Sequence, residues 1–161
     1  MVQMNTGFVL ALALCIGLIN GLRSFTAPAV VAWAAHLRWI DLRHSYFAFL
    51  GSTAAACVLT ALAVGELVVD KRPGTPNRTA ALGLTARIVM GALSGAALCI
   101  AGNRSAALGA VLGGMGAIVG AFAGYKARTG LVSAFKTPDY VIAVLEDVVA
   151  VGGGFLIVSR F

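Results

Sequence analysis

Charged residues are scarce in this chain of 161 residues. They make up 11% of the sequence, whereas apolar residues make up 60%. An ordinary soluble domain has about twice that share of charge. The mean hydropathy is +0.93. So little charge cannot cover a water-exposed surface, so the composition excludes an ordinary soluble domain and indicates one integral membrane domain over residues 1–161.

Residues that bind metals or act as nucleophiles are also few. The two histidines, His36 and His44, are eight residues apart, and no CxxC or HExxH spacing occurs. Serine-nucleophile, phosphate-binding and dinucleotide-binding motifs are missing too. We therefore expect no metal, no cofactor, no catalytic residue and no enzymatic activity. A membrane enzyme that acts on lipids is less strongly excluded than an enzyme of the soluble type.

Cysteines number three, and Cys15, Cys57 and Cys99 each lie midway along an apolar run. We interpret them as buried free thiols that pack as small hydrophobes. The net charge is +6, but the basic residues stand at the ends of apolar runs, as expected beside anionic headgroups. Membrane lipids are therefore the predicted partners, and nucleic acid is not.

Five apolar segments are long enough to cross about 30 Å of hydrocarbon as helices, the first only marginally. We predict an all-α polytopic bundle with spans at about residues 7–22, 46–69, 80–101, 105–125 and 140–158. No basic residue precedes the first span, so it is expected to be retained and not cleaved as a signal peptide. With five spans the bases divide six to five, which leans toward a cytoplasmic N-terminus and leaves insertion in both orientations open.

A shorter apolar piece lies between the first two spans, within residues 24–44. Pro28 suits the first turn of a helix over about residues 27–37, and Thr26 is a plausible N-cap. The helix is too short to span. Trp33 and Trp39 favour the membrane interface, so we favour an interfacial helix over a re-entrant one.

Glycines follow one face of the fourth predicted span, in steps of four, three, four and four residues. Such a stripe allows a neighbouring helix to approach backbone to backbone. We therefore predict that this span is central and that its glycines pack another helix, within the chain or in a homo-oligomer. These residues are Gly109, Gly113, Gly116, Gly120 and Gly124.

Acidic residues number only six, yet Glu66, Asp70, Glu146 and Asp147 lie within or at the edges of predicted spans. Charge inside a membrane is costly, so these side chains are expected to face a partner or a hydrated cavity. Arg87 lies at about the same depth in the third span as Glu66 in the second. We predict a buried Glu66–Arg87 pair with Asp70 close by, acting either as a folding ion pair or as part of a polar transport site.

Arg23 follows the first span directly. If the helix breaks there, Arg23 and the next helix N-terminus would point at an anion. The simpler alternative is an arginine that reaches to lipid headgroups.

The motifs at residues 21–28 (GLRSFTAP), 65–71 (GELVVDK), 76–79 (PNRT) and 145–147 (LED) resemble a family of small bacterial membrane proteins. That family is known as a domain of unknown function, number four-one-two-six. The resemblance covers most of the chain and implies a small polytopic membrane protein. It implies no activity and no site residue.

Buried charge in a short chain with almost no extramembrane region favours a transporter or channel for a small solute or ion that the sequence does not name. The expected location is the bacterial inner (cytoplasmic) membrane, and the expected partner is a second copy or another membrane protein. Two alternatives remain open: a non-catalytic structural or assembly subunit of a larger membrane complex, and a lipid-handling protein.

Overall fold

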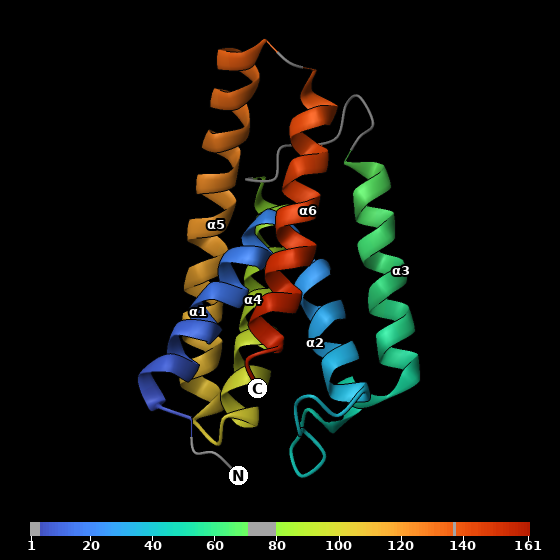
Figure 1. Ribbon diagram of the computed structural model, residues 1–161, viewed down its shortest axis with the longest axis vertical. Helices are drawn as coiled ribbons and strands as arrows, with labels where there is room; N and C mark the ends of the chain where they lie inside the picture. Colours follow the sequence, from blue (N-terminus) through green and yellow to red (C-terminus); the bar gives the residue numbers. More distant parts are fainter. Residues whose placement is uncertain (1–3, 71–79, 137) are drawn as a thin grey trace.

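The computed structural model describes residues 4–70, 80–136 and 138–161, and within these ranges the regular structure is helical throughout (Figure 1). The predicted all-α class is confirmed. The elements are α1 (Thr6–Leu22), α2 (Thr26–His36), the 3-10 turn η1 (Ala48–Gly51), α3 (Thr53–Val69), α4 (Ala81–Ala101), α5 (Ala106–Phe135) and α6 (Asp139–Val158).

Helix α5 packs closely against both α1 and α4 through glycine. A Cβ atom added at Gly113 would lie 2.1 Å from the carbonyl oxygen of Gly91 on α4, and one added at Gly109 would lie 2.4 Å from that of Gly95. On the other side, a Cβ atom at Gly120 would lie 2.3 Å from the carbonyl oxygen of Leu18 on α1. These backbones are too close for any side chain, so glycine is required at the crossings.

The rest of the α5 stripe also lies inside the bundle. A Cβ atom at Gly116 would lie 2.4 Å from the carbonyl oxygen of Leu14, and Gly124 is buried. One face of α5 therefore meets two helices, with Gly109 and Gly113 toward α4 and Gly116 and Gly120 toward α1.

Helices α1 and α2 form a hairpin whose tip lies inside the bundle. Most of α2 is buried, and it packs against α3 and α6 (Figure 1). The indole Nε1 of Trp33 donates a hydrogen bond of 2.9 Å to Oγ1 of Thr60 on α3. The interfacial interpretation of residues 27–37 is therefore wrong, because Val30, Val31 and the alanines around them are enclosed by other helices and leave no broad face for a headgroup layer.

The two termini lie at the same end of the molecule (Figure 1). Arg104, in the turn between α4 and α5, donates a hydrogen bond of 3.1 Å to the carbonyl of Met4. Met4 and Phe161 both pack against the small cluster around Val9. Five full spans would put the termini on opposite sides, so that arrangement is wrong. The reason is that α2 leads the chain back toward the end from which α1 started.

Within the described residues, three helices, α4, α5 and α6, are long and apolar enough to cross a membrane, fewer than the five predicted. Helices α1 and α3 are shorter apolar helices of 17 residues each, about 26 Å at 1.5 Å per residue, which is at the lower limit for a spanning helix. The predicted second span also begins too early, since α3 starts at Thr53 with the Ser52 hydroxyl accepting from the Ala55 amide at 3.1 Å.

The outer surface of the bundle is apolar. Large side chains such as Val58, Val111 and Val148 are more than half exposed. Cys15 and Cys57 are exposed as well, and only Cys99 is buried, so the expectation of three buried thiols is wrong for two. Outward positions can stay apolar where lipid tails replace protein contacts.

Candidate functional site

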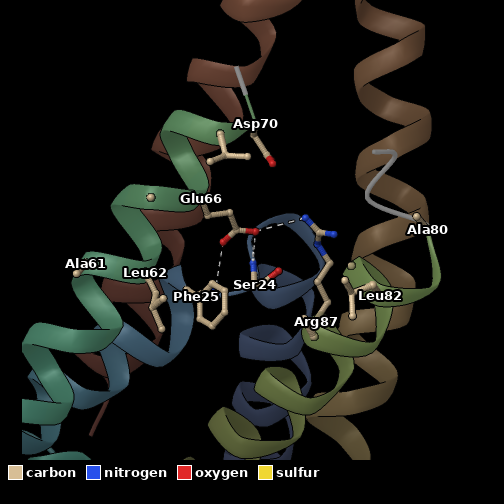
Figure 2. A pocket seen from close by; sticks show the side chains of 13 residues that line it. Ser24, Phe25, Ala61, Leu62, Glu66, Asp70, Ala80, Leu82 and Arg87 are labelled. Carbon is tan, nitrogen blue, oxygen red and sulfur yellow. Dashed lines mark hydrogen bonds and ion pairs between the residues drawn. The ribbon is translucent and has the colours of Figure 1, made fainter. Parts of the chain in front are cut away.

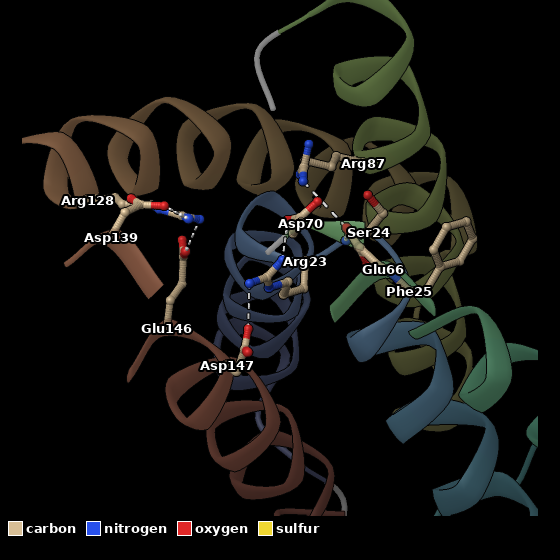
Figure 3. Close-up of polar contacts among 10 residues, drawn as sticks. All are labelled: Arg23, Ser24, Phe25, Glu66, Asp70, Arg87, Arg128, Asp139, Glu146 and Asp147. Carbon is tan, nitrogen blue, oxygen red and sulfur yellow. Dashed lines mark hydrogen bonds and ion pairs between the residues drawn. The ribbon is translucent and has the colours of Figure 1, made fainter. Parts of the chain in front are cut away.

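Arg23, at the tip of the α1–α2 hairpin, joins two other helices (Figure 3). Its side chain is fully buried. The guanidinium forms an ion pair with Asp70 at the end of α3, and its Nη2 lies 2.6 Å from Oδ1 of Asp147. Asp147 is the ninth residue of the 20-residue α6, so the pair lies near the middle of that helix. Arg23 therefore neither reaches the surface nor stays free for an external anion.

Glu66 of α3 caps the N-terminus of α2. Its Oε1 accepts a hydrogen bond of 2.8 Å from the Ser24 amide, and its Oε2 accepts one of 3.0 Å from the Phe25 amide. The first amides of a helix have no partner within the helix and favour negative charge. The predicted anion position at this break is thus occupied from within the protein, by a carboxylate about 40 residues further along the chain.

Glu66 also meets Arg87 of α4. The Nη2 atom of Arg87 lies 3.4 Å from Oε1 of Glu66, and the Arg87 side chain is 4% exposed. The structure therefore contains the pair that the depths of these residues predict. One carboxylate links the hairpin tip, α3 and α4.

A second ion cluster joins α5 to α6. Arg128 lies 2.5 Å from Asp139 and 3.7 Å from Glu146. Glu146 and Asp147 are sequence neighbours, but they face different arginines because adjacent helical residues point about 100° apart. Asp139 is absent from the sequence-based candidates. Its spacing of seven residues from Glu146, two helical turns on one face, is the signal that would have found it.

The five side chains at the hairpin tip form one group, here called the tip network: Arg23, Glu66, Asp70, Arg87 and Asp147. Among the described residues, three carboxylates face two guanidinium groups in this network. Charge out of water is costly unless opposite charges lie close to it. The tip network is therefore a buried set of ionisable groups that lie within reach of one another.

A cavity of about 500 Å³ adjoins the tip network between α3 and α4 (Figure 2). Glu66, Asp70 and Arg87 supply its charged part, and Leu62 and Leu82 belong to its apolar walls. Its size is within the range of small-molecule sites. Among the described residues no group of three or more histidine, cysteine or acidic side chains is placed to hold a metal ion.

Comparison with known families gives one result. The profile of a family described as a domain of unknown function, DUF4126, matches residues 10–159. The chain belongs to the DUF4126 family. Neither the search of curated proteins nor the search of solved structures gives a match. The family resemblance noted from the sequence is thus confirmed.

Five of the six charged candidates in this DUF4126 chain, all except Arg23, were expected from their sequence positions to lie near α3 and α4 or on α6. The structure brings Glu66, Asp70, Arg87, Arg23 and Asp147 into one network. It leaves Glu146 in the Arg128 cluster. The bridge from α3 to α6 through Arg23 is the part that sequence reasoning missed, because it exists only when the chain turns back after α1.

Proposed function

We propose that this DUF4126 chain is a small transporter or channel in which the tip network binds the transported ion or solute, or the proton coupled to it. The observation that carries the proposal is the cluster of buried ionisable side chains near the middle of α6, at the break between α1 and α2. Ionisable groups inside membrane bundles commonly mark ion pathways, and interrupted helices commonly form transport sites.

The membrane arrangement that fits this role has α3 to α6 crossing the bilayer. Helices α1 and α2 then form a re-entrant hairpin that enters and leaves on the side of both termini. Support comes from the adjacent termini, from the buried α2 and from the contact of Trp39 with Phe155 near the end of α6, at a ring-centroid distance of 6.5 Å. We propose a bacterial inner membrane location and assembly with a second copy or another membrane protein, without enzymatic activity.

Reconstitution into liposomes tests the proposal. The purified chain should give measurable flux of at least one probe among protons, small metal cations and small anions. Asp147→Asn removes one carboxylate of the tip network and leaves Arg23 its Asp70 partner, so flux should fall at least tenfold while the protein still folds.

Asp41→Asn is the matched control, because Asp41 is half-exposed and pairs with Arg43 outside the tip network. Its flux should equal that of the unmodified chain. Absence of flux for all three probes, or equal flux in Asp147→Asn, contradicts transport through this network. A protein that co-purifies in fixed stoichiometry with an inactive chain would favour the structural-subunit alternative.

A further inference from the structure

We propose that the loop between α2 and η1 is a docking surface for anionic phospholipid headgroups, with Trp39 at the boundary between headgroups and acyl chains. This loop, residues 37–47, is here called the end loop. Figure 1 shows it at the end of the molecule where both termini lie. The end loop follows the C-terminus of α2, whereas the tip network lies at the N-terminus of that helix, so lipid docking does not depend on transport.

Buried apolar side chains fix the end loop to the bundle. Ile40 and Leu42 are each 2% exposed and belong to the main hydrophobic core. The residues that alternate with them, Trp39, Asp41 and Arg43, are exposed. The end loop therefore presents a defined outer surface, with its apolar anchors turned inward.

The two tryptophans of the chain have different surroundings. Trp33 forms a hydrogen bond with Thr60 between α2 and α3, whereas Trp39 is 46% exposed. The Trp39 ring meets Phe155 of α6 edge-on, with 6.5 Å between the ring centroids. Phe155 and its neighbour Leu156 are themselves 41% and 57% exposed, so the apolar outer face of α6 continues to the level of Trp39. Tryptophan is enriched where hydrocarbon meets headgroups, because its ring is apolar and its N–H is polar.

Basic side chains adjoin this apolar edge. Arg38 precedes Trp39 in the chain, and Arg160 lies in the turn that follows α6. Both arginines are exposed. Asp41 is the single acidic residue in the sequence of the end loop, and it pairs with Arg43 at 2.7 Å. Positive charge beside an apolar surface suits the phosphate groups of anionic lipids.

A leaflet of lipid fits this surface better than a soluble acidic partner does. A soluble polyanion would neutralise the exposed arginines, but it would leave the apolar face of α6 around Phe155 and Leu156 in water. Tyr46 of the end loop is 99% exposed, and tyrosine, like tryptophan, favours the headgroup level. An anionic phospholipid carries the apolar chain and the negative head in one molecule, so it satisfies both parts of the surface.

Brominated lipids test the depth of Trp39, because bromine quenches tryptophan fluorescence at close range. The full chain is reconstituted in vesicles of phosphatidylcholine and phosphatidylglycerol in equal parts, with bromine near the headgroup end or near the methyl end of the acyl chains. The chain has two tryptophans, so the difference between the unmodified chain and Trp39→Phe gives the Trp39 signal. We expect bromine near the headgroups to quench this signal at least twofold more strongly. A Trp39 signal that neither position quenches, or that the deeper bromine quenches more, would overturn the proposal.

The headgroup is tested by moving the bromine from one lipid to the other in the same mixture. The Trp39 signal should be quenched at least twofold more when phosphatidylglycerol carries the bromine than when phosphatidylcholine does. Arg38→Gln combined with Arg160→Gln should remove this preference and leave the depth of Trp39 unchanged, a combination that a loss of folding would not produce.

Lys126→Gln combined with Lys136→Gln is the matched control for this double variant. It removes the same charge from exposed positions toward the end of α5 that lies away from the termini, so the preference should persist. Equal quenching by the two lipids in the unmodified chain would overturn the proposal. A preference that survives the loss of both arginines, or that the lysine variant also loses, would overturn it as well.

Discussion

Two regions of this molecule are held together by opposite means. Where α5 crosses α1 and α4, the helix backbones meet at glycines, with no charged group between them. We call the glycines at these crossings the glycine core: Gly17, Gly91, Gly95, Gly109, Gly113, Gly116 and Gly120. At the hairpin tip, five charged side chains meet beside a cavity of about 500 Å³. The first region has no room for a side chain at its crossings, and the second combines buried charge with an adjoining cavity.

This difference separates the roles of the two regions. A close backbone crossing has one arrangement, so the glycine core is suited to fixing α1, α4 and α5 relative to one another. A charged network beside open space can exchange a partner without repacking. We therefore expect that added side-chain volume in the glycine core, and changes of side-chain charge in the tip network, will have the larger effects on the protein.

The largest effect is expected for Gly113→Leu. The new Cβ atom would lie 2.1 Å from the Gly91 carbonyl oxygen, so two helices would have to separate. The loss of stability should exceed about 3 kcal/mol, the upper end for ordinary overpacking, and little folded protein should be recovered. Melting in detergent measures it. Gly130→Leu on the same helix, where a Cβ atom meets nothing within 4 Å, should melt like the unmodified chain.

Glu66→Gln should be the most damaging change of charge. It removes the negative charge that faces the buried Arg87 and leaves one of the Ser24 and Phe25 amides facing an amide donor, with a cost of about 3–5 kcal/mol. Arg87→Ala should be milder, because a lone glutamate can take up a proton. The double variant should recover part of the loss. A loss equal to the sum of the single losses would mean that the two residues are not coupled.

Smaller effects are expected when Arg23 loses one of its two carboxylates. Asp70→Asn or Asp147→Asn alone should cost about 1.5–3 kcal/mol, the range for a hydrogen bond to a charged group, because the other carboxylate remains. Together they strand a fully buried guanidinium, so the double variant should lose more than the sum. Detergent melting of all three variants would reveal simple additivity, which would reject the shared role of Arg23.

The smallest effect is expected outside both regions, at Asp41. Hydrogen bonds from Arg43 hold the pKa of the Asp41 carboxyl below its ordinary value of about 3.9. A carboxyl whose pKa is lower in the folded than in the unfolded state stabilises the fold at pH values above the unfolded-state pKa. This contribution disappears as the pH falls through the folded-state pKa. Because the pair is solvent-exposed, Asp41→Asn should leave melting unchanged at pH 7. An NMR titration of Asp41 that gives an ordinary pKa would contradict the contact.

The helix ends show which helix limits hydropathy predicts correctly and which it does not. Helices α4 and α6 begin and end within one residue of their predicted limits. Helix α5 continues from the predicted end at Tyr125 to Phe135, and it stops only where Lys136 adopts a positive φ of 49°. The apolar run predicts where a membrane would end, but polar residues such as Lys126 and Arg128 continue a helix as readily as apolar ones.

Only some of the charged pairs could be predicted from the local sequence. Glu66 and Arg87 lie on helices that follow each other in the chain, so 1.5 Å of rise per residue suffices to place them at one depth. The partners of Arg23 depend on the turn after α1, and no local pattern specifies which helices α2 will meet. The buried helix α2 consists mainly of small and β-branched residues. Such residues suit a helix at the membrane interface and a helix inside the bundle equally.

Composition, apolar run length and glycine spacing determine that this chain is all-helical, with helices apolar enough to cross a membrane and a close-packed face on α5. These properties depend only on residues near one another in sequence. The tertiary structure alone decides that the chain turns back after α1, that Glu66 caps α2 and that Arg23 joins Asp70 to Asp147. The physical reason is that a buried charge is satisfied by whichever opposite charge the packing of the helices brings to it, and that packing is set by contacts between residues far apart in the chain.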